Sequence, residues 1–132
     1  MRRETMNTPM SNKVDIDITS PTGAHHFLVI RIGNPRSGSL VILAKEGVKY
    51  HQDIYDSYLA NHPKENVYVQ GGGFMSVDKK EKVIRLWSES GKFGKEPDRE
   101  NTTVPAIQEH YPDFQVLANY DALFPPEPED SE

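Results

Sequence analysis

One stretch of the sequence decides the fold: residues 26–32, His26-Phe27-Leu28-Val29-Ile30-Arg31-Ile32. The stretch is nearly all apolar and rich in β-branched residues, which is typical of a central strand buried on both faces. Residues 33–38 follow with Gly, Asn and Pro, and this composition predicts a turn that ends the strand. We therefore expect the other elements to pack around residues 26–32.

Four further strands are expected around this one. Residues 14–18 alternate apolar and polar side chains, the period of a half-buried strand. Residues 67–70 run into three glycines, Gly71–Gly73, which favour a bulge or a close approach of two backbones. The next strand is expected over residues 82–87 and the last over residues 113–117.

Two helices are expected between the strands. The first covers about residues 48–60, where apolar side chains recur at four-residue spacing in Tyr50, Ile54 and Tyr58. The second begins near Thr103, a good N-cap residue, and ends near Tyr111. Residues 39–44 form a short apolar run whose pattern fits a helix or a strand. The sum is an α/β domain of the α+β type, with five to six strands and two helices.

The length of 132 residues predicts one folded domain. Residues 1–12 are polar without a hydrophobic period, and residues 121–132 combine proline with acidic side chains. Neither end is expected to pack a core, so both are predicted to be disordered. The folded domain is therefore expected over residues 13–120.

The composition argues against several classes of protein. A formal net charge of -5 disfavours a nucleic-acid partner, and the absence of cysteine excludes disulfides and thiolate zinc sites. The longest apolar run, residues 27–30, is far too short to span a membrane, and no apolar segment follows the basic N-terminus. We therefore expect a cytoplasmic protein without a membrane partner.

His51 lies near the start of the first predicted helix. The first turn of a helix offers free backbone N–H groups and a partial positive charge, which stabilise a bound phosphate. Histidine suits proton transfer or nucleophilic attack, because its ordinary pKa lies near neutrality. His51 is therefore the candidate catalytic residue, and the alternative is an ordinary histidine at the surface or the edge of the core.

The loop after the strand over residues 82–87 contains Ser90-Gly91-Lys92. A serine beside glycines can hold an oxyanion with its hydroxyl and with backbone N–H groups. The loop lacks the glycine and lysine spacing of a P-loop, and an ordinary flexible loop explains the same residues. His25 and His26 are adjacent on a strand and point to opposite faces, so no metal site is expected there.

Several of these segments occur together in an order that is characteristic of one family. The most specific block is Tyr50-His51-Gln52-Asp53-Ile54-Tyr55-Asp56, and it is followed by the Gly71–Gly73 run and by Tyr111-Pro112-Asp113-Phe114. This pattern resembles the small phosphohistidine phosphatases and the related Janus and Ocnus proteins, over roughly residues 14–118.

The resemblance implies a mixed β-sheet flanked by two helices. It implies a monomeric phosphatase that uses no metal or cofactor and removes phosphate from histidine in a protein substrate. His51 takes the place of the catalytic histidine, and the choice between nucleophile and general base stays open. The implied phosphate contacts are the backbone N–H groups of Gln52 and Lys92 and the side chain of Ser90, with Gly91 between the last two.

The sequence also departs from the family pattern. A lysine beside the phosphate is replaced by His26, and an arginine after the three glycines is replaced by Phe74. Each missing cation removes a charge-assisted contact worth about 1.5–3 kcal/mol. His26 replaces the lysine only when it is protonated, and Lys45 and Lys92 are candidate compensating cations. The alternative function is a non-catalytic Janus-type module that binds phosphorylated or acidic peptides.

Overall fold

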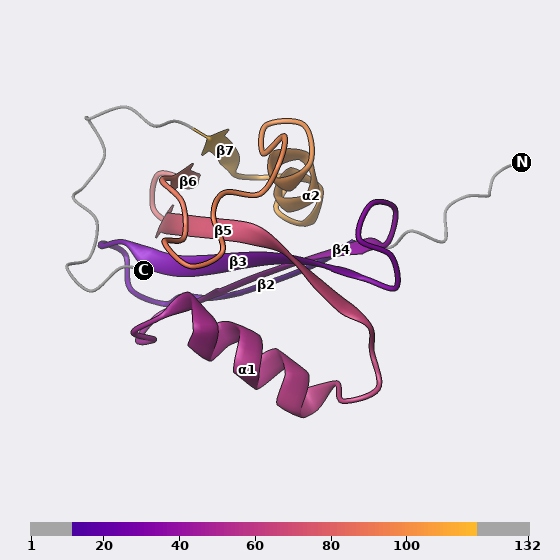
Figure 1. The fold of residues 1–132 in the computed structure, drawn as a ribbon. Helices are drawn as coiled ribbons and strands as arrows, with labels where there is room; N and C mark the ends of the chain where they lie inside the picture. Colours follow the sequence, from indigo (N-terminus) through magenta and orange to yellow (C-terminus); the bar gives the residue numbers. More distant parts are fainter. Residues whose placement is uncertain (1–11, 119–132) are drawn as a thin grey trace, which may run out of the picture.

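The computed structural model describes residues 12–118, and these form one curled mixed sheet of six strands with two helices (Figure 1). In chain order the elements are β2 (Lys13–Asp17), β3 (His25–Ile32), β4 (Ser39–Lys45), α1 (His51–Asn61), β5 (Val67–Asp78), β6 (Val83–Trp87), α2 (Thr103–His110) and β7 (Gln115–Ala118). This confirms the predicted fold class. The ends predicted to be disordered, residues 1–12 and 121–132, lie outside the described residues apart from Asn12, as do residues 119–120.

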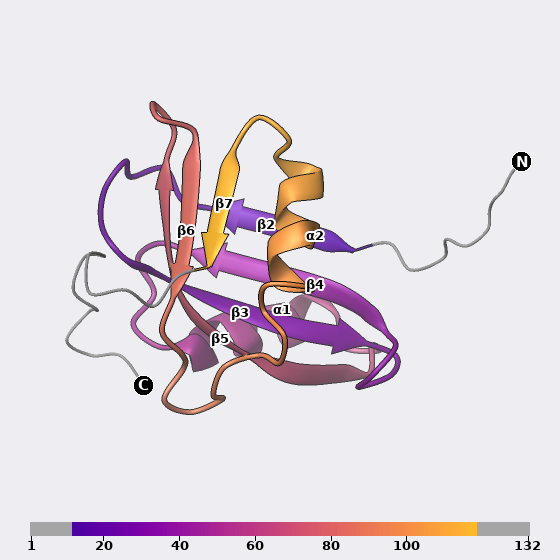
Figure 2. The same cartoon turned by 90° about the horizontal axis from the view of Figure 1, so that it is seen from above.

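The strand order across the sheet is β2-β4-β3-β5-β6-β7. β2 runs parallel to β4 and β6 runs parallel to β7, whereas the pairs in between are antiparallel. α1 packs on β3 and β4 from one face, and α2 lies on the other face against β7, β2 and β4 (Figures 1 and 2). Neither helix within residues 12–118 is long and apolar enough to cross a membrane.

The central strand β3 has the burial that its composition predicts. Leu28 and Ile30 pack toward α1, whereas Phe27 and Val29 pack toward α2, and all four are almost completely buried. Because successive side chains of a strand point to opposite faces, one apolar strand supplies both cores. Burial of each such side chain contributes about 1.5–3 kcal/mol, so β3 anchors both layers.

The structure decides the open assignment of residues 39–44 and corrects the predicted N-terminal boundary of each helix. Residues 39–45 form strand β4, which pairs with both β2 and β3. α1 begins at His51 because Tyr50 is extended, with φ −135° and ψ 152°. The N-cap of α2 is Thr102 rather than Thr103, which is the first helical residue and donates its hydroxyl proton to Glu96 at 2.7 Å.

The three glycines lie inside one continuous strand, β5, instead of ending it. The pairing with β3 shifts between Val29, opposite Gly71, and Ile30, opposite Val69, so Gln70 is the extra residue of a bulge. Gly71 has a φ of +146°, and a Cβ there would lie 2.3 Å from the backbone nitrogen of Glu96. The sequence predicted either a bulge or a close approach, and the structure has both.

Candidate functional site

The candidate catalytic residue, His51, is the first residue of α1 and its side chain reaches the glycine run of β5. Its Nε2 lies 2.8 Å from the carbonyl oxygen of Gly73, and a Cβ on Gly72 would lie 3.1 Å from its Cδ2. Only a residue without a side chain permits the imidazole to lie this close to the strand. None of the surface of His51 is exposed.

The two residues that stand where the resemblance implies cations, His26 and Phe74, both contact His51. The His26 ring meets it edge to face with centroids 4.6 Å apart, and the Phe74 ring is tilted at 5.6 Å. His26 and Phe74 are also cross-strand neighbours on β3 and β5, with ring centroids 5.0 Å apart. Edge-to-face packing of this kind is favourable. His26, His51 and Phe74 therefore form one buried cluster, named here the ring cluster.

The Ser90 loop contacts the same glycine run along the edge of β5 that does not pair with β3. Ser90 N–H donates to the Gly72 carbonyl at 3.1 Å, and Gly72 N–H donates to the Gly94 carbonyl at 2.9 Å. The Ser90 hydroxyl accepts the N–H groups of Lys92 at 3.2 Å and Phe93 at 3.0 Å. The loop thus brings Ser90 to the glycine run, and the Lys92 amide, a predicted phosphate donor, bonds to the Ser90 oxygen.

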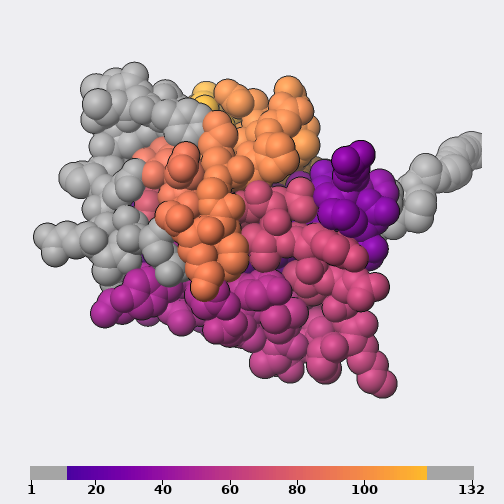
Figure 3. All heavy atoms as spheres, in the orientation of Figure 1, coloured from indigo at the N-terminus to yellow at the C-terminus, as the bar shows by residue number. Residues whose placement is uncertain are grey.

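The loop also reaches α1. Figure 3 shows the segment after β6 crossing the face of the molecule to meet that helix, and the Phe93 ring lies 5.9 Å from the Tyr55 ring. Ser90 is almost completely buried, whereas Gly91 and Lys92 are exposed. The structure therefore brings His51 to Gly73 and Ser90 to Gly72, with the loop tip Gly91-Lys92 on the outside.

The first turn of α1 carries an acidic side chain, Asp53, next to Gln52, whose backbone N–H is a predicted phosphate contact. The Asp53 carboxylate accepts the Tyr50 backbone N–H at 3.0 Å, and the side-chain amide of Gln52 donates to Asp56 at 2.7 Å. A carboxylate in the first turn stabilises the helix end through its dipole. An anion bound at the backbone of Gln52 shares this helix end with Asp53.

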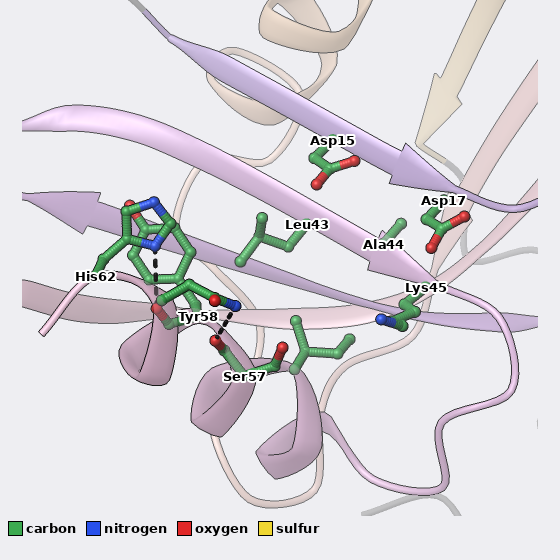
Figure 4. A pocket seen from close by; sticks show the side chains of 10 residues that line it. Asp15, Asp17, Leu43, Ala44, Lys45, Ser57, Tyr58 and His62 are labelled. Atoms are coloured by element: carbon green, nitrogen blue, oxygen red, sulfur yellow. Dashed lines mark hydrogen bonds between the residues drawn. The ribbon is translucent and has the colours of Figure 1, made fainter.

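Lys45, the candidate compensating cation, lies directly opposite His26 in the pairing of β3 and β4. Its exposed side chain borders a pocket of about 150 Å³ between α1 and the ends of β2 and β4 (Figure 4). Asp15 and Asp17 line the wall of this pocket, and Tyr58 and His62 line its far end. The pocket runs along α1 away from His51, whose surface is covered by the ring cluster.

Two buried charged residues, Glu96 and Arg99, support the site and were missed by the sequence analysis. Arg99 donates from Nε and Nη2 to the two Glu96 carboxylate oxygens at 2.8 and 2.7 Å, and from Nη2 to the Gly72 carbonyl at 3.1 Å. Neither residue has more than 1% of its surface exposed. The only signal for them in the sequence is the glycine run, which leaves room on β5 for a large partner.

No three acidic, histidine or cysteine side chains in the described part of the chain gather as metal ligands. No curated protein matches the chain at a significant level. A family model, described as the Janus/Ocnus family (Ocnus), matches residues 10–115. This match covers more than half of the chain and includes His51, the glycine run and the Ser90 loop, so the chain belongs to the Janus/Ocnus family.

Proposed function

We propose that this protein is a metal-independent protein phosphohistidine phosphatase in which His51 acts on the N–P bond. The observation that carries the proposal is the 2.8 Å bond between His51 Nε2 and the Gly73 carbonyl. A carbonyl oxygen only accepts, so Nε2 carries the proton and the neutral ring has its lone pair on Nδ1. A lone pair fixed on one nitrogen is what a nucleophile or a general base requires.

The reaction breaks the N–P bond and leaves its electron pair on the imidazole of the substrate, which gains a proton. Water supplies the new oxygen on phosphorus, either directly or after His51 has carried the phosphoryl group. Because the N–P bond is labile, positioning and charge stabilisation are sufficient for a useful rate. The proposed phosphoryl contacts are the Ser90 hydroxyl and the amides of Gln52 and Lys92, with Lys45 and Lys92 as nearby cations.

Catalysis at this site requires two local changes. His51 has no exposed surface, so a substrate reaches Nδ1 only when a ring of the cluster moves. The Lys92 N–H donates to the Ser90 hydroxyl, so a phosphoryl oxygen must replace that acceptor. Side-chain motions of this size accompany binding in many proteins.

The same burial favours a second function, a non-catalytic module that binds phosphorylated or acidic peptides. The exposed tip of the Ser90 loop, Gly91-Lys92, lies outside the ring cluster and carries a cation. Binding at the tip needs no access to His51. The two functions therefore differ in one measurable respect, the release of phosphate.

The test is hydrolysis of a phosphohistidine peptide by the wild type and by His51→Ala, with His110→Ala as the matched control at the end of α2. The phosphatase proposal expects release by the wild type and by His110→Ala, and loss with His51→Ala. Equal release by all three proteins contradicts the role of His51. Absence of release, together with phosphate-induced NMR shifts at Gln52 and Lys92, supports the binding module instead.

A further inference from the structure

The carbonyl groups of Gly72 and Gly73 are held by side chains on opposite faces of β5. His51 donates to the Gly73 oxygen at 2.8 Å, and Arg99 donates to the Gly72 oxygen at 3.1 Å. A Cβ at Gly72 would meet His51, whereas a Cβ at Gly73 would lie 3.0 Å from the Arg99 Nη2. The two carbonyls belong to successive planar peptide units that meet at the Cα of Gly73, so only the φ and ψ angles of Gly73 separate their orientations.

The Arg99 guanidinium is itself held in one direction. It makes a two-point contact with Glu96, it lies 5.0 Å from the centre of the Phe27 ring, and Glu96 also accepts the Thr103 hydroxyl at 2.7 Å. The planar guanidinium matches a carboxylate in two parallel bonds, which fixes its orientation as well as its place. A buried ion pair is a weak source of stability, because desolvation offsets its attraction. The main effect of the ion pair between Glu96 and Arg99 is therefore to fix the direction of the Arg99 hydrogen bond to the Gly72 carbonyl.

Residues 71–73 have no side chains that could hold their peptide units in place, so they depend on contacts from outside the strand. Residues 71–73 lie beyond the end of β6, whose pairing with β5 begins only at Phe74. On that side the strand is held by the Ser90 loop and by Arg99 instead of a neighbouring strand. Glycine has more conformational freedom than any other residue, so pairing with β3 along one edge alone would restrain these carbonyls less than contacts along both edges.

We infer that Arg99, oriented by Glu96, is a positioning residue for His51. It fixes the peptide units of Gly72 and Gly73, so that the Gly73 carbonyl takes the Nε2 proton and the lone pair stays on Nδ1. This tautomer of His51 is expected in the protein without substrate. Its consequence for turnover rests on the proposed function.

The test is ¹⁵N NMR of the histidine rings, which distinguishes a protonated ring nitrogen from one with a lone pair. The main variant is Glu96→Leu combined with Arg99→Met, because removing both charges together avoids an unpaired buried charge. Arg99→Lys is the second variant: it keeps the charge but lacks the planar two-point contact. The matched control is Tyr58→Phe, which removes a bond to Glu65 at the far end of α1 and leaves the glycine run intact.

The inference expects the His51 proton to move from Nε2 alone to a mixture of both nitrogens in the double variant, and to a smaller extent in Arg99→Lys. The control should keep the wild-type tautomer. The inference is overturned when the double variant, or Arg99→Lys if the double variant does not fold, stays folded with the proton on Nε2 alone. A tautomer change of equal size in Tyr58→Phe also overturns it.

Measurements of kcat and KM test the positioning role of Arg99 separately from the proposed phosphatase activity. Where the wild type hydrolyses phosphohistidine, the double variant should lower kcat on the order of 10²-fold with little change in KM. An altered tautomer without any hydrolysis by the wild type contradicts the phosphatase proposal and supports the positioning role of Arg99. An unaltered tautomer alongside His51-dependent hydrolysis contradicts the positioning role alone.

Discussion

The rings of His26 and His51 meet edge to face with their centroids 4.6 Å apart, and the resemblance to the phosphohistidine phosphatases implies a lysine at the first of these positions. His26 is 3% exposed and lies beside Lys45 in the pairing of β3 and β4. His26 covers His51 and offers a charge to phosphate only when its imidazole is protonated. The contact between these two rings is therefore where a change of residue should alter binding most.

We predict that His26→Lys tightens the binding of inorganic phosphate about tenfold, which corresponds to one charge-assisted hydrogen bond of about 1.5 kcal/mol. The dissociation constant is measured by NMR titration of the Gln52 and Lys92 amides. His25→Lys is the matched control, because the adjacent residue of the strand points to the opposite face. Equal tightening by both variants would indicate a general charge effect rather than a phosphate site beside His51.

Phe74→Ala should open the ring cluster. Phe74 is completely buried against both histidines, so its truncation is expected to cost about 3–5 kcal/mol of unfolding free energy. His51 should then react faster with an imidazole-specific acylating reagent, as followed by mass spectrometry of the peptide that contains it. Ile107→Ala, a truncation in the core on the α2 face, is the control: it should lose comparable stability without exposing His51. Unchanged reactivity in Phe74→Ala would show that another group covers the imidazole.

The fold follows largely from short-range patterns in the sequence, whereas the candidate site rests on the family resemblance carried by the block around His51. The apolar stretch over residues 26–32 predicts the buried strand β3, and the four-residue spacing of Tyr50, Ile54 and Tyr58 predicts α1, which begins at His51 rather than near residue 48. Both depend on neighbours along the chain, which a pattern can represent. The apolar run over residues 39–44 fits either a strand or a helix, because a short buried run has no period that separates the two, and the structure makes it part of β4.

The surroundings of His51 depend on contacts that no local pattern contains. Glu96 and Arg99 are three residues apart in a polar loop, a spacing that is typical of an exposed ion pair. They are buried only because Gly71–Gly73, far earlier in the chain, leave space on β5 for the loop. The contact of the Ser90 loop with β5 has the same origin, since the Ser90 N–H donates to the Gly72 carbonyl.

The glycine run provides a stability test with an internal reference. Gly71→Ala places a side chain at a φ of +146° and 2.3 Å from a backbone nitrogen, whereas Gly33→Ala has a φ of +93° with open space around the new Cβ. Gly33→Ala should therefore cost only the backbone strain, about 1–2 kcal/mol. Gly71→Ala should cost about 1–3 kcal/mol more because of the clash, as measured by urea denaturation. Equal losses of unfolding free energy in the two variants would mean that the loop around Glu96 moves away from β5 without cost.

Protonation of Glu46 should make the protein less stable in acid. Its carboxylate accepts the backbone N–H groups of Ser20 and Thr19 and the Thr19 hydroxyl, and these bonds, led by the one from Ser20, lower its pKa below the ordinary 4.5. A lowered pKa in the folded state gives stability that is present above pH 4.5 and is lost as the pH falls through the folded pKa.

Urea denaturation from pH 7 to pH 3 measures this contribution. Glu46→Gln should be less stable than the wild type at pH 7, and the difference should shrink below pH 4.5. Glu100→Gln keeps Glu46 and its three bonds, so it should retain the wild-type profile. A difference between wild type and Glu46→Gln that stays constant across this range would rule out Glu46 as the titrating group.

Ionisation of Tyr58 should make the protein less stable at alkaline pH. Burial first, and then the 2.6 Å bond to Glu65 and the charge of that carboxylate, raise the pKa of the Tyr58 hydroxyl above its ordinary value of 10. A raised pKa in the folded state gives stability that is fully present below pH 10 and is lost as the pH rises toward the folded pKa. The stabilised form is the neutral phenol, which donates its proton to Glu65.

Tyr58→Phe removes both the hydrogen bond and the titration. It should lower the unfolding free energy by about 1 kcal/mol at pH 8, and the gap to the wild type should close as the pH rises above 10, because only the wild type loses the contribution of a neutral phenol there. Chemical denaturation between pH 8 and pH 11.5 gives both curves. Tyr68→Phe, at an exposed tyrosine near the start of β5, leaves Tyr58 in place and should run parallel to the wild type. A gap for Tyr58→Phe that widens above pH 10 would mean that the phenolate, rather than the phenol, is the form stabilised beside Glu65.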